Sequence, residues 1–213
     1  IRLAIMPIGE NAPSFVAAEQ GFFKKHGLEV TLVELPFATN VVQGLVSNSI
    51  EIGSPSSVTL ATAINAGLDL VGIAGMSVTN HSGSRSYTLA STQSGITTLE
   101  GLIGKKVAIS GLNGQIDVSM RYQLVRHGID PAGITFVELP FPAQPDALKS
   151  GAIDATITVD PFVGRIVDSG LGVIVKKTSD EAPEGVSTSF YASTRVWADA
   201  HPEELAAFRA ALE

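Results

Sequence analysis

The sequence of 213 residues contains no cysteine. This absence excludes disulfide bonds, thiolate metal sites and cysteine nucleophiles together, and it leaves the redox compartment of the protein open. Aromatic residues are also few, with nine Phe, three Tyr and one Trp. An extensive aromatic cage around a ligand would therefore have to draw on a small supply.

Long hydrophobic runs are missing as well. Hydrophobic residues make up 45% of the chain, but its apolar stretches are strand-sized and are broken by Gly, Ser or Thr. A membrane-spanning helix needs about 18 consecutive apolar residues, so we expect a soluble chain. There is also no leading basic segment followed by an apolar run and a small-residue cleavage site, which indicates either that no signal peptide exists or that the chain is a trimmed, mature form.

Positive charge is scarce and dispersed. Fourteen Lys and Arg stand against twenty-one Asp and Glu, which gives a net charge of −7. The basic residues do not gather on one helix or stripe, as they do in proteins that bind nucleic acid. We therefore expect no nucleic-acid partner.

The common catalytic and metal-binding motifs are absent. The sequence has no GxSxG, HExxH or GxGxxG pattern. The four histidines show no metal-ligand spacing; they are His26, His81, His127 and His201. We expect a protein that is not an enzyme, with no catalytic residue, metal site or cofactor.

What the sequence does contain is an internal repeat. Residues 30–37 read VTLVELPF and residues 134–141 read ITFVELPF, so that six of eight positions are identical. Further pairs follow in the same order, among them His26-Gly27 with His127-Gly128. Because glycine readily takes the left-handed conformation that closes a helix, both His-Gly pairs are interpreted as helix ends rather than as ligand sites.

Each copy of the repeat alternates between strand and helix patterns. In the first copy the apolar runs predict strands at 2–6, 30–35, 51–53 and 70–74, and helical patterns cover 14–25, 39–47 and 57–66. The second copy predicts strands at 106–110, 135–139, 155–159 and 172–175. This alternation predicts an α/β protein of two similar lobes, each with a mostly parallel sheet covered by helices on both faces, around a ligand cleft.

The position of the ligand follows from the fold class. In open α/β sheets, ligands lie beyond the carboxyl ends of strands, against helix N-termini. This rule selects four turns, at 9–14, 54–57, 110–115 and 158–162. The polar candidates for ligand binding in these turns are Asn11, Ser54, Ser56, Ser57, Ser110, Asn113, Gln115 and Asp160.

Several of these residues have structural alternatives. Ser56 is well placed as the N-cap of the following helix, and Asp160 before Pro161 has the same alternative. Asn11 close to Pro13 has the alternative of a simple Asx turn. His81 and Arg85 lie between the lobes, where they are among the few basic groups within reach of an anion, although a linker role is the alternative for such a Gly/Ser-rich stretch.

Three segments also carry a family resemblance. Residues 17–30 (AAEQGFFKKHGLEV), 99–108 (LEGLIGKKVA) and 147–155 (ALKSGAIDA), together with Pro161, resemble the NMT1/THI5-like and SsuA-type substrate-binding proteins of ABC transporters. These receptors take aliphatic sulfonates, nitrate, taurine or thiamin precursors. The resemblance covers nearly the entire chain.

The resemblance implies a type II periplasmic binding-protein fold, in which the chain crosses twice between lobes that close on the ligand. The crossings are expected near 79–88 and 187–193. Lobe 1 would then comprise 1–82 with 190–213, and lobe 2 would comprise 86–187. Members of the family usually continue beyond the last helical pattern, at 202–212, so part of lobe 1 is expected to be missing or reduced.

The resemblance also implies a function. The chain would be the periplasmic or lipid-anchored extracytoplasmic receptor of an ABC importer, a monomer whose partners are a small-molecule ligand and the transporter permease. Serine-rich helix starts favour an anionic ligand and Asp160 adds room for a donor, which suits a sulfonate, a carboxylate or a pyrimidine. Two alternatives remain: a ligand-sensing domain of a regulator, and a pyrimidine-biosynthesis enzyme similar to the fungal thiamin-pyrimidine synthases, whose cysteine-rich motif is absent here.

Overall fold

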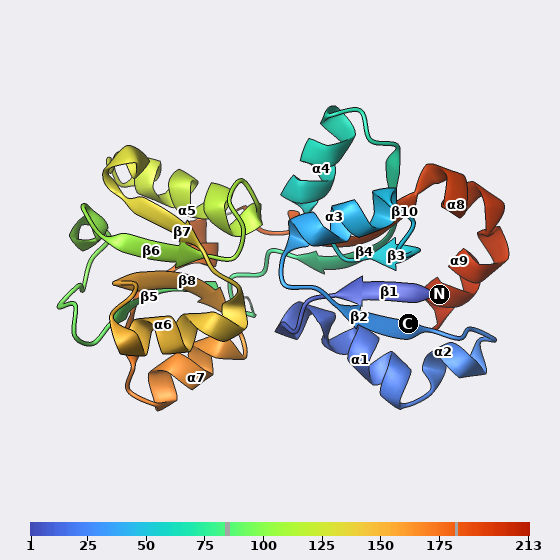
Figure 1. Ribbon diagram of the computed structural model, residues 1–213, viewed down its shortest axis with the longest axis horizontal. Coiled ribbons are helices and arrows are strands. Elements are labelled where there is room, and N and C mark those ends of the chain that lie inside the picture. The colour runs from blue at the N-terminus through green and yellow to red at the C-terminus, as the bar shows by residue number, and fades with distance from the viewer. Residues whose placement is uncertain (84–85, 182) are drawn as a thin grey trace. The chain divides into compact units, whose positions relative to one another are not determined.

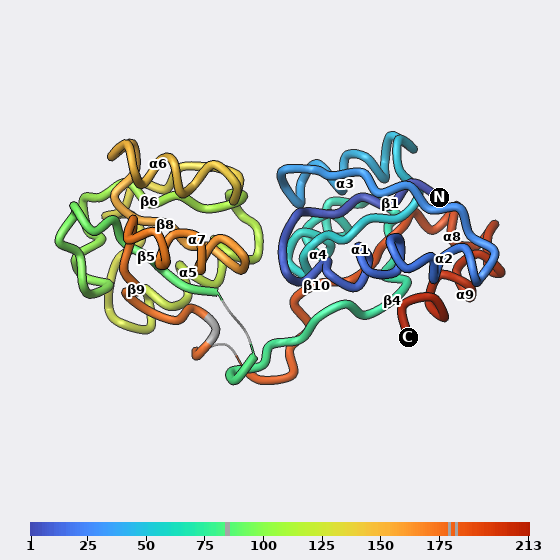
Figure 2. Tube along the Cα trace, turned by 90° about the horizontal axis from the view of Figure 1, so that it is seen from below, coloured from blue at the N-terminus to red at the C-terminus, as the bar shows by residue number. Residues whose placement is uncertain are grey.

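The computed structural model describes residues 1–83, 86–181 and 183–213 (Figure 1). The chain divides into two compact units. Unit 1 comprises Ile1–Val78 and Ser187–Glu213, and unit 2 comprises Thr79–Val186. The chain therefore passes from unit 1 to unit 2 after Val78 and returns after Val186. Both passages can be followed in Figure 2, where the trace is coloured by residue number. These bounds differ by a few residues from those expected from the sequence.

A five-stranded sheet forms the centre of unit 1. Its strand order is β2-β1-β3-β10-β4, with β1 parallel to both β2 and β3, and β10 antiparallel to its two neighbours. The strand bounds are β1 Arg2–Ile5, β2 Thr31–Glu34, β3 Ile52–Gly53, β4 Leu70–Val78 and β10 Ser187–Thr194.

Unit 2 repeats this arrangement. Its sheet has the order β7-β6-β8-β5-β9, with β6 parallel to β7 and β8, and β5 antiparallel to its neighbours. The bounds are β5 Ser86–Ser91, β6 Lys106–Ile109, β7 Thr135–Glu138, β8 Ala155–Val159 and β9 Gly172–Lys177. The two VELPF segments lie at equivalent places, because β2 pairs with β1 as β7 pairs with β6. The predicted α/β class with two parallel-dominant sheets is confirmed.

The segments expected to be crossings are partly strands. Residues 187–193 lie within β10, and the end of the range 79–88 lies within β5. Both strands enter the interior of a sheet, where Tyr191 is 2% exposed and Ala192, Leu89 and Ala90 are fully buried. Strand β10 begins directly after the chain returns to unit 1, whereas β5 begins at Ser86, several residues after the chain enters unit 2 at Thr79.

Helices cover both faces of each sheet (Figure 1). In unit 1, four helices pack on one face and two on the other: α1 Ala12–Glu19, α2 Phe22–Lys25, α8 Arg195–Ala200 and α9 Pro202–Ala210 opposite α3 Ala38–Val46 and α4 Ser57–Asn65. In unit 2, α5 Gln115–Arg126 packs on one face, opposite α6 Gln144–Ser150 and α7 Phe162–Asp168. Short 3₁₀ helices are formed by Gly9–Asn11, Glu100–Leu102, Pro131–Gly133, Phe141–Ala143 and Thr178–Glu181.

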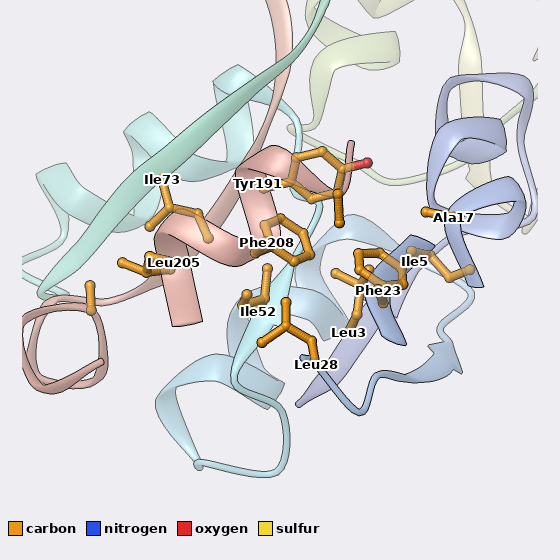
Figure 3. Packing of buried hydrophobic residues seen from close by; sticks show 12 residues of the cluster. Leu3, Ile5, Ala17, Phe23, Leu28, Ile52, Ile73, Tyr191, Leu205 and Phe208 are labelled. Carbon is orange, nitrogen blue, oxygen red and sulfur yellow. The ribbon is translucent and has the colours of Figure 1, made fainter. Parts of the chain in front are cut away.

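The core of unit 1 draws on both ends of the sequence (Figure 3). Phe23 of α2 stacks on Phe208 of α9 with ring centroids 5.7 Å apart, and Tyr191 of β10 meets Phe208 edge-on at 5.1 Å. Leu3 and Ile5 point to this cluster, whereas Ala4 between them faces the helices of the other side, as strand alternation requires. Such aromatic pairs contribute about 0.5–1.5 kcal/mol beyond the burial of their area. The cluster fixes β10 and the last helix in unit 1.

The prediction of one continuous helix at 14–25 is wrong, because the segment forms two helices. Gly21 has φ 72° and divides this segment into α1 and α2. By contrast, Gly27 and Gly128 follow the histidines with φ 78° and 73° at the ends of α2 and α5, as predicted for helix ends. Within the described ranges, no helix is long and apolar enough to cross a membrane.

Candidate ligand-binding site

The first half of the site lies where β1 and β3 of unit 1 end. Asn11 occupies the N-cap position of α1 and is fully buried. Its Oδ1 accepts a hydrogen bond from the Ser54 hydroxyl at 2.9 Å, which joins the loop after β1 to the loop after β3. The Asn11 Nδ2 group is buried and has no hydrogen-bond partner within unit 1 or the described part of unit 2. Because an unpaired buried donor is costly, this amide is a candidate for contact with a ligand or an ordered water.

Beside Asn11 lies a carboxylate that sequence reasoning missed. The Ser189 hydroxyl donates to Glu10 Oε2 at 3.1 Å, and Ser189 Oγ in turn lies 2.6 Å from Ser77 Oγ. Ser77 Oγ also lies 2.5 Å from Thr188 Oγ1. Desolvation by burial raises the pKa of the Glu10 carboxyl, although the hydrogen bonds from Ser189 and Ser77 oppose this rise. The available signal was an acidic residue in the turn after the first strand of a lobe.

Ser56 and Ser57 have structural partners at the start of α4. Ser56 is the N-cap, and its Oγ accepts from the Thr59 N–H at 3.1 Å. Ser57 donates its hydroxyl to the Ser187 carbonyl oxygen at 2.7 Å. Ser56 therefore caps α4, as its structural alternative predicted. A role of Ser56 in ligand binding stays a prediction.

In unit 2, the turn after β6 carries Ser110, Asn113 and Gln115. Asn113 is exposed and has φ 60°, a conformation that Asn tolerates better than most residues. Its N–H donates to Asp117 Oδ2 at 2.8 Å, and Asp117 pairs with Arg121 at 2.5 Å. Gln115 begins α5 and donates to Ser119 Oγ at 3.2 Å. Ser110 is half-buried.

Asp160 follows β8 at the same edge of the unit 2 sheet. The N-cap position of α7 is Pro161, so Asp160 lies one residue before it, and its part in ligand binding stays a prediction. Three polar atoms of unit 2 are buried without a hydrogen-bond partner among the described residues: Thr158 Oγ1 in β8, Ser86 Oγ opposite the end of β8, and Gln144 Oε1 at the start of α6. Like Asn11 in unit 1, these atoms lie where parallel strands end.

His81 lies in the segment that follows β4. Its N–H donates to Glu184 Oε1 at 2.9 Å, and its carbonyl oxygen accepts from the Lys177 ammonium. Arg85 lies outside the described residues. The structure thus brings together Asn11, Ser54 and Glu10 in unit 1, and it places Ser110, Asn113, Gln115 and Asp160 at the equivalent edge of unit 2. No group of three or more potential metal ligands occurs within the described ranges.

Comparison with known proteins identifies the family of the chain. The model of the NMT1-like family matches residues 1–212. The chain belongs to the NMT1-like family. The nitrate import ATP-binding protein NrtC of Synechocystis sp. is 29% identical over 194 residues, which cover 84% of this chain and 29% of that protein. The bicarbonate-binding protein CmpA of Synechococcus elongatus is 27% identical over 234 residues, which cover 95% of this chain and 50% of that protein. The NMT1-like chain thus spans half the length or less of these curated relatives.

Solved structures show the same fold. The alkanesulfonate-binding protein SsuA from Xanthomonas axonopodis pv. citri, bound to MOPS, superposes with a TM-score of 0.85 at 20% identity, covering 100% of this chain and 71% of that chain. The NMT1-like chain therefore has the type II periplasmic binding-protein fold that its sequence motifs predicted.

Proposed function

We propose that this protein is the extracytoplasmic solute-binding receptor of an ABC importer, and that it captures a small anionic or zwitterionic organic molecule as its two units close. The observation that carries the proposal is the fully buried Asn11 amide, whose Nδ2 is unpaired where β1 and β3 end. Ligands of open α/β sheets bind at this place. An NMT1-like chain with an unpaired polar group there is suited to binding rather than catalysis.

The names of the similar proteins support the anionic character of the proposed ligand. They refer to nitrate, bicarbonate and an alkanesulfonate, all of them small oxyanions. Helix N-termini at the proposed site suit an oxyanion, because their free N–H groups and the helix dipole attract negative charge. The proposed partners are this solute and the transporter permease, and the receptor is proposed to act as a monomer in the periplasm or tethered outside the membrane, without a nucleic-acid partner. The proposed ligand-binding residues are those predicted from the sequence, together with Glu10: Asn11, Ser54, Ser56, Ser57, His81, Arg85, Ser110, Asn113, Gln115 and Asp160.

A thermal-shift screen tests the proposal. The panel comprises taurine, alkanesulfonates, nitrate, bicarbonate, aromatic acids and thiamin precursors. A ligand that binds only the folded state stabilises it by about 2.7 kcal/mol at 100 times Kd, which raises the melting temperature of a chain of this size by several degrees. If no solute of this panel shifts the melting temperature, the receptor function is wrong.

A variant of Asn11 locates the binding. Asn11→Asp keeps an acceptor for the Ser54 hydroxyl but removes the Nδ2 donor, so we expect it to weaken binding of any hit at least about tenfold. Asn65→Asp, at the exposed end of α4, is the matched control and should leave affinity unchanged. Equal affinity of the wild type and Asn11→Asp would remove the observation on which the proposed site rests. If Asn11→Asp does not fold, Ser54→Ala, which removes the hydroxyl that holds the Asn11 amide, tests the same site and should also weaken binding.

A further inference from the structure

The edge of unit 1 where the ligand is proposed to bind is acidic. Glu10 lies in the turn after β1, and Glu34 is the last residue of β2. Both residues keep exposed surface at this edge, although the protein around the Glu10 carboxyl partly desolvates it. The equivalent edge of unit 2 carries Glu138, the last residue of β7, and Asp160 after β8. A bare anion arriving at these strand ends would meet carboxylates.

The cations of unit 1, all of whose residues the structure describes, are engaged elsewhere. Arg2 at the opposite end of β1 pairs with Glu51, and Arg195 pairs with Asp69 at 2.9 Å beyond the other end of β10. Arg209 donates to the Ile73 carbonyl oxygen, four residues before Ser77 along β4. Lys24 and Lys25 lie in the last turn of α2. Among the described residues, the hydrogen-bond partners of Glu10 are therefore serine hydroxyls rather than a basic side chain.

The surroundings of Glu10 hold a carboxylate in place without neutralising it. The Ser189 hydroxyl donates to Oε2 at 3.1 Å, and Ser189 is 4% exposed, so the donor side of this part-buried contact is fixed in the interior. Ser77 is held 2.6 Å from Ser189 and supports that hydroxyl from the neighbouring strand. A carboxylate that accepts hydrogen bonds from hydroxyls retains acceptor capacity for a charged donor.

The next residue along the chain offers the opposite chemistry. Asn11 is fully buried and its Nδ2 donor is unpaired, whereas its Oδ1 is occupied by Ser54. Consecutive residues at one strand end thus supply a carboxylate with remaining acceptor capacity and an amide donor without a partner among the described residues. This pair complements a molecule that carries a cationic N–H group and an oxyanion a short distance apart.

Building on the proposed receptor function, we propose that the solute is a zwitterion whose protonated amine pairs with Glu10, while its oxyanion faces Asn11 and the start of α1. Glu10 is then the residue that determines specificity. It favours aminosulfonates or amino acids over the same anions without nitrogen, and over inorganic anions such as nitrate and bicarbonate. A charge-assisted hydrogen bond of this kind corresponds to a preference of about tenfold or more.

Titration calorimetry with matched pairs tests this specificity. The pairs are taurine with ethanesulfonate, 3-aminopropanesulfonate with propanesulfonate, and β-alanine with propionate, together with nitrate and bicarbonate. We expect the amine of at least one pair to bind the wild type about tenfold or more tightly than its partner. Glu10→Gln should remove this preference, because the neutral amide keeps the shape of the side chain but not its charge. Glu19→Gln, which removes an exposed carboxylate at the end of α1, should preserve the preference.

The outcomes separate this inference from the proposed function. If ethanesulfonate, propionate, nitrate or bicarbonate binds as tightly as the amines, the zwitterion proposal is overturned while the receptor function stands. The proposal is likewise overturned if Glu10→Gln leaves the preference intact, or if none of the three amines binds while another solute of the broader screen does. A screen in which no solute binds overturns both.

Discussion

At the scale of single residues, a buried hydrogen bond joins the start of the chain to its end. Ser14 of α1 and Tyr191 of β10 place their hydroxyl oxygens 2.7 Å apart, and the two residues are 0% and 2% exposed. Burial also raises the pKa of the Tyr191 hydroxyl, so it remains a neutral phenol at physiological pH. Tyr191→Phe would leave the Ser14 hydroxyl buried without this partner.

We expect Tyr191→Phe to lower the free energy of unfolding by about 1–2 kcal/mol in urea denaturation. Tyr122→Phe, at a residue 46% exposed on α5, is the control and should change it by less than about 0.5 kcal/mol. Equal stability of the two variants would show that the Ser14–Tyr191 bond contributes nothing measurable.

The raised pKa of Glu10 predicts a pH-dependent stability difference. Desolvation makes the folded state bind the Glu10 proton more tightly than the unfolded state does, and its nearest partners, Ser77 and Ser189, do not titrate in this range. Stability therefore falls as pH rises from the unfolded pKa, about 4.3, through the higher folded value. Glu10→Gln should unfold at a higher temperature than the wild type at pH 7, and this advantage should shrink below about pH 4. A constant difference between pH 3 and pH 7 would contradict the assignment.

At the scale of elements, the N-caps of two helices allow the effect of capping on stability to be distinguished from an effect on ligand binding. Ser56 caps α4 near the proposed site, and Thr194 caps α8 beyond the other end of the sheet through the Trp197 N–H at 3.3 Å. Each change to Ala should cost about 0.5–2 kcal/mol of stability. Only Ser56→Ala should also weaken ligand binding in calorimetry. Loss of affinity in both variants would indicate general destabilisation rather than contact with the solute.

At the scale of the whole molecule, the duplicated units predict a hinge. The chain passes between them twice, after Val78 and after Val186, and short passages between similar units are typical of receptors that close around a ligand. We expect the radius of gyration in small-angle scattering to decrease when a confirmed ligand saturates the protein. An unchanged value at saturation would contradict closure from an open form.

The absence of cysteine allows a second measurement of this motion. Cysteines introduced at Asn65 and Val125, exposed residues of units 1 and 2, would be the only thiols and could carry spin labels. The ligand should shift the distance distribution between the labels. Two labels placed within unit 1, at Val46 and Asn65, provide the control and should show no shift.

Much of the architecture was determined by the sequence alone. The VTLVELPF and ITFVELPF segments predicted two equivalent β2- and β7-type strands, since apolar alternation and turn residues act locally and both copies contain them. The same local patterns predicted strand ends, and with them the loops that contain Asn11, Ser54 and Ser110. The positive φ of Gly21 is also compatible with what the sequence shows, because glycine is the residue that most readily adopts such a φ.

Only the tertiary structure decided which distant segments meet. Strands β5 and β10 look like Ser/Thr-rich linkers in the sequence, and they become antiparallel strands because their backbone groups are paired by partners such as β8, nearly 70 residues away along the chain, and β4, more than 100 residues away. The sequence did not indicate a role for Glu10 for the same reason. Its carboxylate accepts a hydrogen bond from the Ser189 hydroxyl, and Ser189 is 179 residues away along the chain. Local patterns encode which face of a strand is buried, whereas the pairing of remote polar groups depends on the whole chain having folded.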